Sequence, residues 1–281
     1  MRRFFYVKLQ AERDYRTNAM NEQPIGIFDS GVGGTSIWRE IHRLLPREHT
    51  LYLADSKNAP YGEKPAEEIL RLSIKNTECL LARGCKLVVV ACNTATTNAI
   101  DYLRAHYDVP FIGIEPAIKP AALNSRSGTV GVLATRGTLS SSLFHSTSNL
   151  HAKGIKVVEQ EGKGLVELIE AGKENSTQTR DLLSHYLQPM LAAKIDHLVL
   201  GCTHYPYLLP LLRELLPADI NIIDCGEAVA RQTKHILQKN GLLNGSVHKS
   251  RHTFFTNGNV NILRSFMANT PGDIHVSYLD F

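Results

Sequence analysis

The chain has 281 residues, of which 43% are hydrophobic and 21% charged, and this composition is typical of a folded globular protein rather than a disordered one. Its net charge is only +4, with Lys and Arg scattered along the chain, so the basic footprint of a nucleic-acid-binding protein is missing and a small ligand is expected instead. Because the chain has no apolar stretch of about 18 residues and its five cysteines lack framework spacing, we expect no membrane partner and a cytoplasmic location.

Residues 1–23 are predicted to form an N-terminal extension. The segment starts with two arginines and a short apolar patch, as a signal peptide does. Acidic residues and further arginines then follow where a signal peptide would stay apolar and end in small residues.

Short apolar runs recur along the rest of the chain, each followed by small or polar residues and then by a helical pattern. This alternation predicts parallel sheets covered by helices on both faces. The predicted strands are Ile25–Phe28, Thr50–Leu53, Lys86–Val90, Phe111–Ile114, Thr129–Leu133, Ile155–Val158, His197–Leu200 and Ile220–Ile223. Between them, segments such as Ala66–Arg83 and Gln178–Ala193 are long enough to be crossover helices.

The two halves of the chain resemble each other. IGIFDSGVGG from Ile25 aligns with VGVLATRGTL from Val130, and LVVVACNT around Cys92 aligns with HLVLGCTH around Cys202, at a nearly constant offset. A duplicated half is the simplest explanation. We therefore predict an α/β fold of two pseudo-symmetric, doubly wound parallel-sheet domains with the active site between them. Their expected extents are residues 24–115 plus 226–281 for the first domain and residues 116–225 for the second.

Several polar residues directly follow predicted strands, where ligands bind in open parallel sheets. These residues are Asp29, Ser30, Cys92, Thr135 and Cys202. If the two halves face each other, equivalent residues reach the ligand from opposite sides. The two cysteines would then flank it.

Two opposed cysteines suit the inversion of an α-carbon, because one group must remove a proton from one face while another delivers a proton to the opposite face. An unperturbed thiol pKa near ~8.5 lets a thiolate and a thiol coexist after modest tuning. Cys92 and Cys202 are also expected to begin helices, whose dipoles lower thiol pKa values. The remaining cysteines, Cys79, Cys85 and Cys225, lack polar neighbours and are predicted to be inert.

Other strand-end residues can assist such a reaction. Asp29 and His204 can relay a proton or hold a substrate ammonium group. Ser30, Asn93, Thr94, Thr135 and Thr203, with the turns at 31–34 and 60–62, offer neutral hydrogen bonds to carboxylates. Each of them taken alone has an ordinary alternative as a helix cap or a surface side chain.

Five motifs resemble those of the glutamate racemase family within the aspartate/glutamate racemase superfamily. They are FDSGVGG at 28–34, PYGEK at 60–64, VVACNTAT at 89–96, GVLATRGT at 131–138 and VLGCTHYP at 199–206, in family order. The resemblance implies a two-domain fold with the site between the domains. It also implies racemisation of L-glutamate to D-glutamate for peptidoglycan, with no cofactor. No metal site is expected, because Cys202, His204 and Cys225 lack the close ligand pairs of zinc motifs.

The same resemblance carries residue roles over to this chain. Cys92 would serve the D-enantiomer and Cys202 the L-enantiomer, assisted by Asp29, by His204 and by Glu170 in LVELIE. The implied substrate contacts are Asp29, Ser30, Tyr61, Gly62, Asn93, Thr94, Thr135, Thr203 and His204. A homodimer and a cell-wall-precursor effector are further partners that the resemblance allows, besides glutamate itself.

Two rival interpretations stay open. An aspartate racemase would share the fold and both thiols, but relatives of that type resemble GCTE at the second cysteine, where this chain has Thr203-His204. A dinucleotide-dependent oxidoreductase is suggested by Gly31-Val32-Gly33 with Asp55 about 20 residues on. In that pattern Ser36 replaces the third glycine, and the duplicated cysteine motif would be unexplained.

Overall fold

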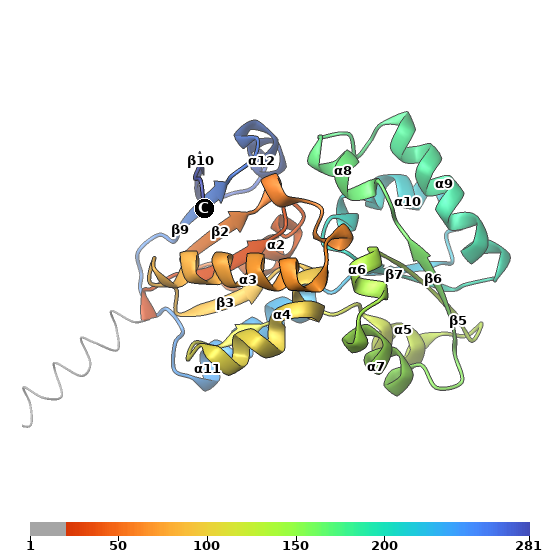
Figure 1. Ribbon diagram of the computed structural model, residues 1–281, viewed down its shortest axis with the longest axis horizontal. Coiled ribbons are helices and arrows are strands. Elements are labelled where there is room, and N and C mark those ends of the chain that lie inside the picture. The colour runs from red at the N-terminus through yellow and green to blue at the C-terminus, as the bar shows by residue number, and fades with distance from the viewer. Residues whose placement is uncertain (1–20) are drawn as a thin grey trace, which may run out of the picture.

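The computed structural model describes residues 21–281, and these form two parallel β-sheets with helices around them (Figure 1). Residues 1–20 of the predicted N-terminal extension lie outside the described residues. The first sheet has six strands in the order β10-β9-β2-β1-β3-β4, all paired in parallel. Its strands are β1 (Ile25–Asp29), β2 (Thr50–Ala54), β3 (Leu87–Val90), β4 (Phe111–Ile112), β9 (Arg251–Thr256) and β10 (Asp273–Tyr278).

The second sheet has four parallel strands in the order β6-β5-β7-β8. These strands are β5 (Thr129–Ala134), β6 (Lys156–Glu161), β7 (His197–Gly201) and β8 (Asn221–Ile223). The order repeats that of β2-β1-β3-β4 in the first sheet, so β1 corresponds to β5 and β3 to β7. The predicted α/β fold with two parallel sheets of repeated topology is confirmed.

Helices pack on the sheets because the strands bury apolar side chains on both faces. On β1 and β3, Ile25, Ile27 and Val89 face one core, while Phe28 and Val90 face the other. Each such burial stabilises the fold by about 1.5–3 kcal/mol. The helices of the first sheet are α2 (Thr35–Leu44), α3 (Ala66–Leu81), α4 (Asn93–His106), α11 (Gly226–Lys239) and α12 (Val260–Met267).

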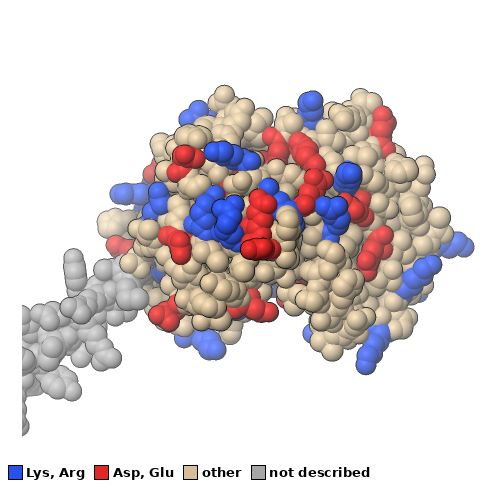
Figure 2. Space-filling model, viewed as in Figure 1, with Lys and Arg blue, Asp and Glu red and all other residues tan. Residues whose placement is uncertain are grey.

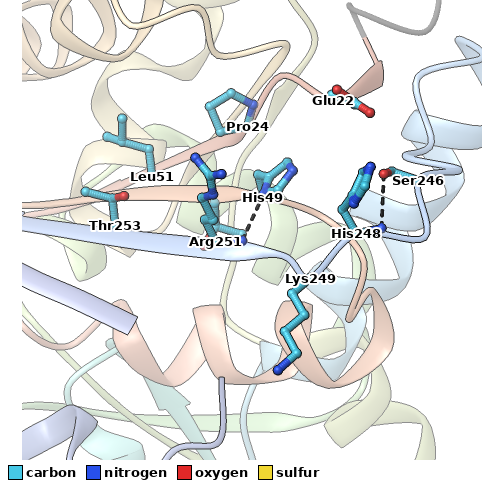
Figure 3. A pocket seen from close by; sticks show the side chains of 10 residues that line it. Glu22, Pro24, His49, Leu51, Ser246, His248, Lys249, Arg251 and Thr253 are labelled. Atoms are coloured by element: carbon cyan, nitrogen blue, oxygen red, sulfur yellow. Dashed lines mark hydrogen bonds between the residues drawn. The ribbon is translucent and has the colours of Figure 1, made fainter. Parts of the chain in front are cut away.

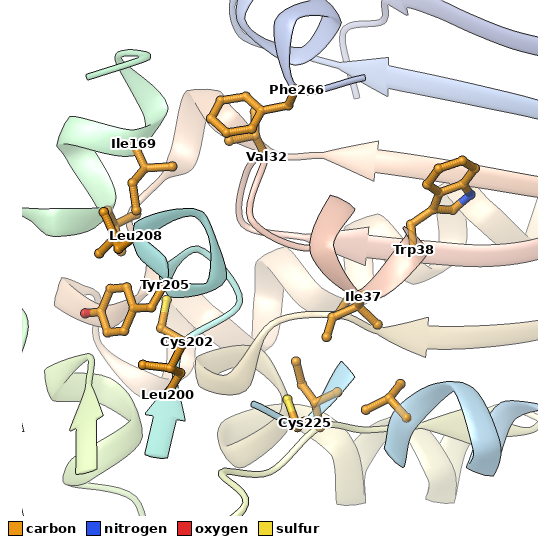
Figure 4. Close-up of a cluster of buried hydrophobic side chains, with 14 of the residues drawn as sticks. Val32, Ile37, Trp38, Ile169, Leu200, Cys202, Tyr205, Leu208, Cys225 and Phe266 are labelled. Carbon is orange, nitrogen blue, oxygen red and sulfur yellow. The ribbon is translucent and has the colours of Figure 1, made fainter. Parts of the chain in front are cut away.

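The helices around the second sheet are α5 (Ile118–Asn124), α6 (Arg136–Leu139), α7 (Ser142–His151), α8 (Leu165–Glu170), α9 (Thr177–Ala192) and α10 (Leu209–Leu215). Most of these helices have seven residues or fewer, the exceptions being α7 and α9. We call each sheet with its helices a unit, the six-stranded sheet forming the first and the four-stranded sheet the second. One continuous apolar cluster joins them, with Val32 and Phe266 from the first unit and Ile169 and Tyr205 from the second (Figure 4). Cys202 belongs to this cluster, so the second predicted thiol sits where the two units meet.

Several strands differ from the sequence prediction, two of them for visible reasons. β4 ends at Ile112 rather than Ile114, because the N–H of Ile114 donates to Thr96 Oγ1 (3.0 Å) instead of to a strand. The edge strand β10 was not predicted, since DIHVSY alternates polar and apolar residues and is only partly buried. It extends the first sheet beyond β9, which pairs with β2.

Acidic and basic side chains are interspersed on the face of the molecule shown in Figure 2. Among residues 21–281, no helix is both long enough and apolar enough to cross a bilayer.

Candidate active site

The carboxyl ends of four strands bring the predicted site residues together. A small cavity there is lined by Ser30, Pro60, Tyr61, Gly62, Cys92, Asn93, Thr94, Thr135, Val166, Cys202, Thr203 and His204. Asp29 and Glu170 do not line it, but both hydrogen bond to residues that do. The cavity has a free volume of about 10 Å³, close to the least that one water molecule needs. Both cysteines therefore line one small cavity.

Cys92 caps the N-terminus of α4. Its Sγ accepts from the N–H of Ala95 (3.4 Å), and its thiol donates to Ser30 Oγ (3.8 Å). Burial, followed by the charge of Asp29, raises the pKa of the Cys92 thiol well above its usual value. The expected lowering of this pKa by the helix is wrong for the closed structure, because burial outweighs the hydrogen bond from Ala95.

Cys202 has a different setting from the predicted helix N-terminus. The residues after it form a 3₁₀ turn, Tyr205–Leu208, before α10 begins at Leu209. Its closest polar partner is His204, whose Nδ1 lies 3.7 Å from Sγ. The imidazole, rather than a helix dipole, is therefore the group that can stabilise a thiolate here.

His204 connects Cys202 to a carboxylate. Its Nε2 lies 2.6 Å from Glu170 Oε1, and its side chain is only 1% exposed. Burial lowers the pKa of His204, but the hydrogen bonds to Cys202 and Glu170 and the charge of Asp29 outweigh burial and raise this pKa well above its usual value. The geometry is that of an imidazolium placed between a carboxylate and a thiol.

The N–H of Gly33 also lies 3.2 Å from Nε2 of His204. A nitrogen that donates to Glu170 cannot accept from Gly33 at the same time. The shorter distance to Glu170 and the raised pKa of His204 assign the proton to Nε2 and the hydrogen bond to Glu170. Gly33 instead allows the close approach of the His204 ring, since an added Cβ at this position would lie 2.2 Å from His204 Nδ1.

Asp29 is fully buried at the end of β1. Its Oδ2 accepts from the N–H of Gly34 (2.8 Å) and of Gly31 (3.3 Å), and its Oδ1 accepts from Thr203 Oγ1 (3.4 Å). Burial raises the pKa of Asp29, although His204 and the bond from Gly34 act in the opposite direction. A carboxyl with a raised pKa can exchange protons more readily near neutral pH.

Neutral polar groups complete the cavity. The side-chain amide of Asn93 is buried, and neither its oxygen nor its nitrogen has a hydrogen-bond partner among the described residues. Hydroxyls of Thr94, Thr135 and Thr138 lie 2.9–3.4 Å from one another, with Thr94 in the first unit and the other two in the second. These groups are suited to bind a carboxylate that enters between the units.

The hydroxyl of Tyr61 turns away from the cavity. It donates to Asp55 Oδ2 (2.5 Å) and accepts from Asn76 Nδ2 (3.0 Å). Asp55 is fully buried and also accepts from Asn58 and Asn257. Sequence reasoning considered Asp55 only as a ribose ligand, whereas in the structure its carboxylate is occupied in holding the turn that carries Tyr61.

The remaining cysteines do not line the cavity. Burial raises the pKa of both Cys85 and Cys225 to about 12, and burial also raises the pKa of Cys79. Within residues 21–281, no three His, Cys, Asp or Glu side chains are grouped so as to hold a metal ion.

A larger cavity of about 400 Å³ lies at the opposite, amino edge of the six-stranded sheet (Figure 3). His49, which precedes β2, and Arg251, which begins β9, are among its lining residues. The Lys249 side chain extends away from the other labelled groups. None of the predicted site residues lies here, so the small cavity with both thiols is the better candidate site.

Comparison with known proteins agrees with this geometry. Residues 25–233 match the model of the family described as Asp/Glu/Hydantoin racemase. The chain belongs to this racemase family. The matched segment contains every predicted site residue, so the family resemblance inferred from the five motifs is confirmed.

Individual members of the racemase family are similar over most of the chain. A glutamate racemase of Herpetosiphon aurantiacus is 47% identical over 239 residues, covering 85% of this chain and 94% of that protein. The glutamate racemase isoform of Bacillus anthracis has a TM-score of 0.83 at 31% identity, covering 93% and 98% of the two chains. The structure of Escherichia coli glutamate racemase with L-glutamate and the activator UDP-MurNAc-Ala has a TM-score of 0.79 at 34% identity, covering 91% and 99%.

Proposed function

We propose that this chain interconverts L- and D-glutamate without a cofactor, using Cys92 and Cys202 as the two proton-transferring groups. The observation that carries the proposal is that two thiols, placed at equivalent strand ends of a repeated fold, line one small cavity. Glutamate is chosen because the similar proteins carry the name glutamate racemase and because Thr203-His204 follows the second thiol.

The closed structure is poised for L-glutamate. His204, with its raised pKa, holds a proton 3.7 Å from Cys202 Sγ, where its charge can stabilise a thiolate as the reaction needs one, while the raised pKa of Cys92 keeps that thiol protonated. Cys202 takes the α-proton from one face, which leaves a carbanion-like α-carbon. Cys92 then delivers its own proton to the opposite face, so the product is D-glutamate and the charge has moved from one thiolate to the other.

The reverse direction starts with Cys92 as the thiolate. Asp29 is the ionisable group on that side, and its raised pKa suits it to assist in removing the Cys92 proton. Substrate contacts come from Ser30, Gly62, the Asn93 amide, Thr94, Thr135 and Thr203. Hydrogen bonds to the α-carboxylate stabilise the charge that develops during proton abstraction.

Glutamate can enter only when the cavity opens, because the free volume matches about one water molecule. We take residues 24–115 with 226–281 as one domain and residues 116–225 as the other, so that opening separates the two around the connections near residues 115 and 225. Closure would then exclude water from the carbanion-like species.

The biological context follows from the same assignment. D-glutamate would be supplied in the cytoplasm for peptidoglycan synthesis. An effector derived from a cell-wall precursor, like the activator held by the E. coli protein, is part of this proposal. So is assembly into a homodimer.

The test is incubation of purified protein with L-glutamate in deuterium oxide without added cofactor. Optical rotation and α-deuterium by NMR are followed alongside the Cys92→Ser and Cys202→Ser variants, with L-aspartate in parallel. We expect glutamate to racemise with α-deuterium incorporation and both variants to lose activity by several orders of magnitude. Racemisation of aspartate but not glutamate would overturn the choice of glutamate as substrate. Absence of α-deuterium exchange with either amino acid would overturn the assignment as a racemase.

A further inference from the structure

One carboxylate in the structure is held by groups from both sheets. Glu170 ends α8 of the second unit, and its Oε1 accepts from the N–H of Val32 (2.6 Å) as well as from His204 (2.6 Å). Its Oε2 accepts from Ser56 Oγ (2.8 Å). Val32 and Ser56 follow β1 and β2, so two of the three donors come from the other unit.

Ser56 is placed with little freedom. The preceding residue, Asp55, accepts a hydrogen bond from Asn257 Nδ2, and the N–H of the following Lys57 donates to Asn257 Oδ1 (3.0 Å). Gly258 packs against it so closely that an added Cβ would lie 2.7 Å from Ser56 Cβ. The hydroxyl is therefore presented to Glu170 from a backbone fixed on both sides.

We propose that Ser56 is a positioning residue that fastens Glu170 when the two units close and thereby turns that carboxylate toward His204. Among the described residues, Ser56 is the one donor to Oε2 of Glu170, so its hydroxyl fixes the rotation of the carboxylate. This inference rests on the proposed function, because it assigns Ser56 to the proton transfer by Cys202.

The consequence is that closure and activation of Cys202 are coupled. When the units separate, the donors Val32 and Ser56 leave Glu170, and His204 loses an oriented partner for its charge. The Cys202 thiolate is then favoured only in the closed site, where substrate rather than water surrounds it. Among the described residues, Cys92 makes no hydrogen bond to Ser56 or Glu170, so we expect the main effect on the L-specific side.

The two enantiomers have equal free energy, so kcat/KM must stay equal in the two directions for every variant. A variant that slows proton transfer by only one of the two cysteines therefore changes the substrate isotope effects, whereas the two values of kcat/KM stay equal to each other. We expect Ser56→Ala to lower kcat/KM about tenfold in both directions, as for loss of one hydrogen bond to a charged group. The isotope effect with α-deuterated L-glutamate should rise and that with α-deuterated D-glutamate should fall. Ser56→Thr should restore both.

Ser265→Ala is the matched control, because it removes a serine hydroxyl on α12 that donates only to Ile262 O. It should leave rates and isotope effects unchanged. A merely structural defect in Ser56→Ala would reduce the active fraction and move neither isotope effect. Isotope effects that stay as in the wild type, or a loss that Ser56→Thr does not restore, overturn the proposal.

A measurement without substrate separates this inference from the racemase assignment. Imidazole NMR should show the His204 Nε2 proton bonded to Glu170, identified by its absence in His204→Asn. We expect this resonance to shift or broaden away in Ser56→Ala and to return in Ser56→Thr. An unchanged resonance in Ser56→Ala overturns the role of Ser56 even if glutamate racemises, and a changed one supports it even if glutamate proves not to be the substrate.

Discussion

Thr94 Oγ1 and Thr135 Oγ1 lie 2.9 Å apart, although Thr94 lies in the first turn of α4 beside the six-stranded sheet and Thr135 follows β5 of the four-stranded sheet. The contact joins the two units at the wall of the cavity that holds both thiols. In the proposed reaction, a substrate carboxylate would replace this contact when it enters between the two hydroxyls.

Thr135→Ala should therefore weaken substrate binding. Loss of one hydrogen bond of about 1–1.5 kcal/mol predicts a KM about five- to tenfold higher for both enantiomers, with little change in kcat. Steady-state kinetics in both directions measure this. Thr147→Ala is the control, because Thr147 is a partly buried threonine of the same unit that lies outside the cavity and donates to Glu115. A lower kcat at unchanged KM would contradict a binding role.

His204→Asn should slow proton transfer by Cys202 and leave proton transfer by Cys92 unchanged. Because the imidazolium is lost, proton abstraction by Cys202 becomes slower. We expect kcat/KM to fall equally in both directions by about 10²–10⁴, the usual contribution of a side chain that takes part in acid–base catalysis. The isotope effect with α-deuterated L-glutamate should rise while that with the D-enantiomer falls. The opposite pattern would place His204 on the Cys92 side.

The pH dependence has a definite sign. Because the pKa of His204 is raised, its cation persists above pH 6.5 and is lost only as pH rises through the higher value. In the wild type, kcat for L-glutamate should thus not decline between pH 6.5 and 7.5. A decline centred near pH 6.5 would show that His204 titrates as an ordinary imidazole.

The sequence was sufficient for the features that local patterns encode. Apolar runs followed by small residues predicted the strands β1, β2, β3, β5 and β7, and the repeat around Cys92 and Cys202 predicted that both thiols lie at strand ends. The Asp/Glu racemase family followed from the five motifs. These features depend on residues close together in the chain.

Features set by packing between distant segments were missed. Ser56 and Glu170 are 114 residues apart, and no pattern around either one indicates the hydrogen bond between them. The raised pKa of Cys92 has the same origin, since this thiol is buried among residues far from it in the chain, including Phe28 and Tyr61. Edge strand β10 was missed because one of its faces is solvated, so its residues lack a continuous apolar run.

Acid should destabilise the protein through His252. Burial, with His42 and His49 nearby, lowers the pKa of His252 to about 4, while its neutral ring bonds Thr50 Oγ1 (2.9 Å) and Ser250 Oγ (3.1 Å). Below the unfolded pKa near ~6.5 the unfolded chain binds the extra proton, so stability falls as pH drops from about 6.5 to 4. Between pH 7 and 5 this group should contribute a loss of about 2 kcal/mol.

Urea unfolding at both pH values measures this loss. His252→Gln removes the titrating group, so its free energy of unfolding should depend less on pH than that of the wild type, by the same about 2 kcal/mol. Equal pH dependence in the two proteins would mean that His252 is not the buried neutral group described.

Gly62→Ala should hold the site open. An added Cβ at Gly62 would lie 2.7 Å from Thr135 Cβ, and no positive φ forbids alanine there, so the cost appears only when the units close. We expect a higher KM and a lower kcat, together with faster alkylation of Cys202 by iodoacetamide, because this thiol is only 8% exposed in the closed structure.

Mass spectrometry of the alkylated protein measures labelling of Cys202 and of the other cysteines in the same sample, so the other cysteines serve as an internal reference. Cys85 and Cys225, whose pKa values are raised to about 12 by burial, should stay unlabelled in both proteins at pH 8 and report that the fold is intact. Gly245→Ala is the control, since an added Cβ there meets no atom within 4 Å. Glutamate should protect Cys202 in the wild type, because closure buries this thiol, but should protect it poorly in Gly62→Ala. Equal protection in the two proteins would show that contact between Gly62 and Thr135 is not needed for closure.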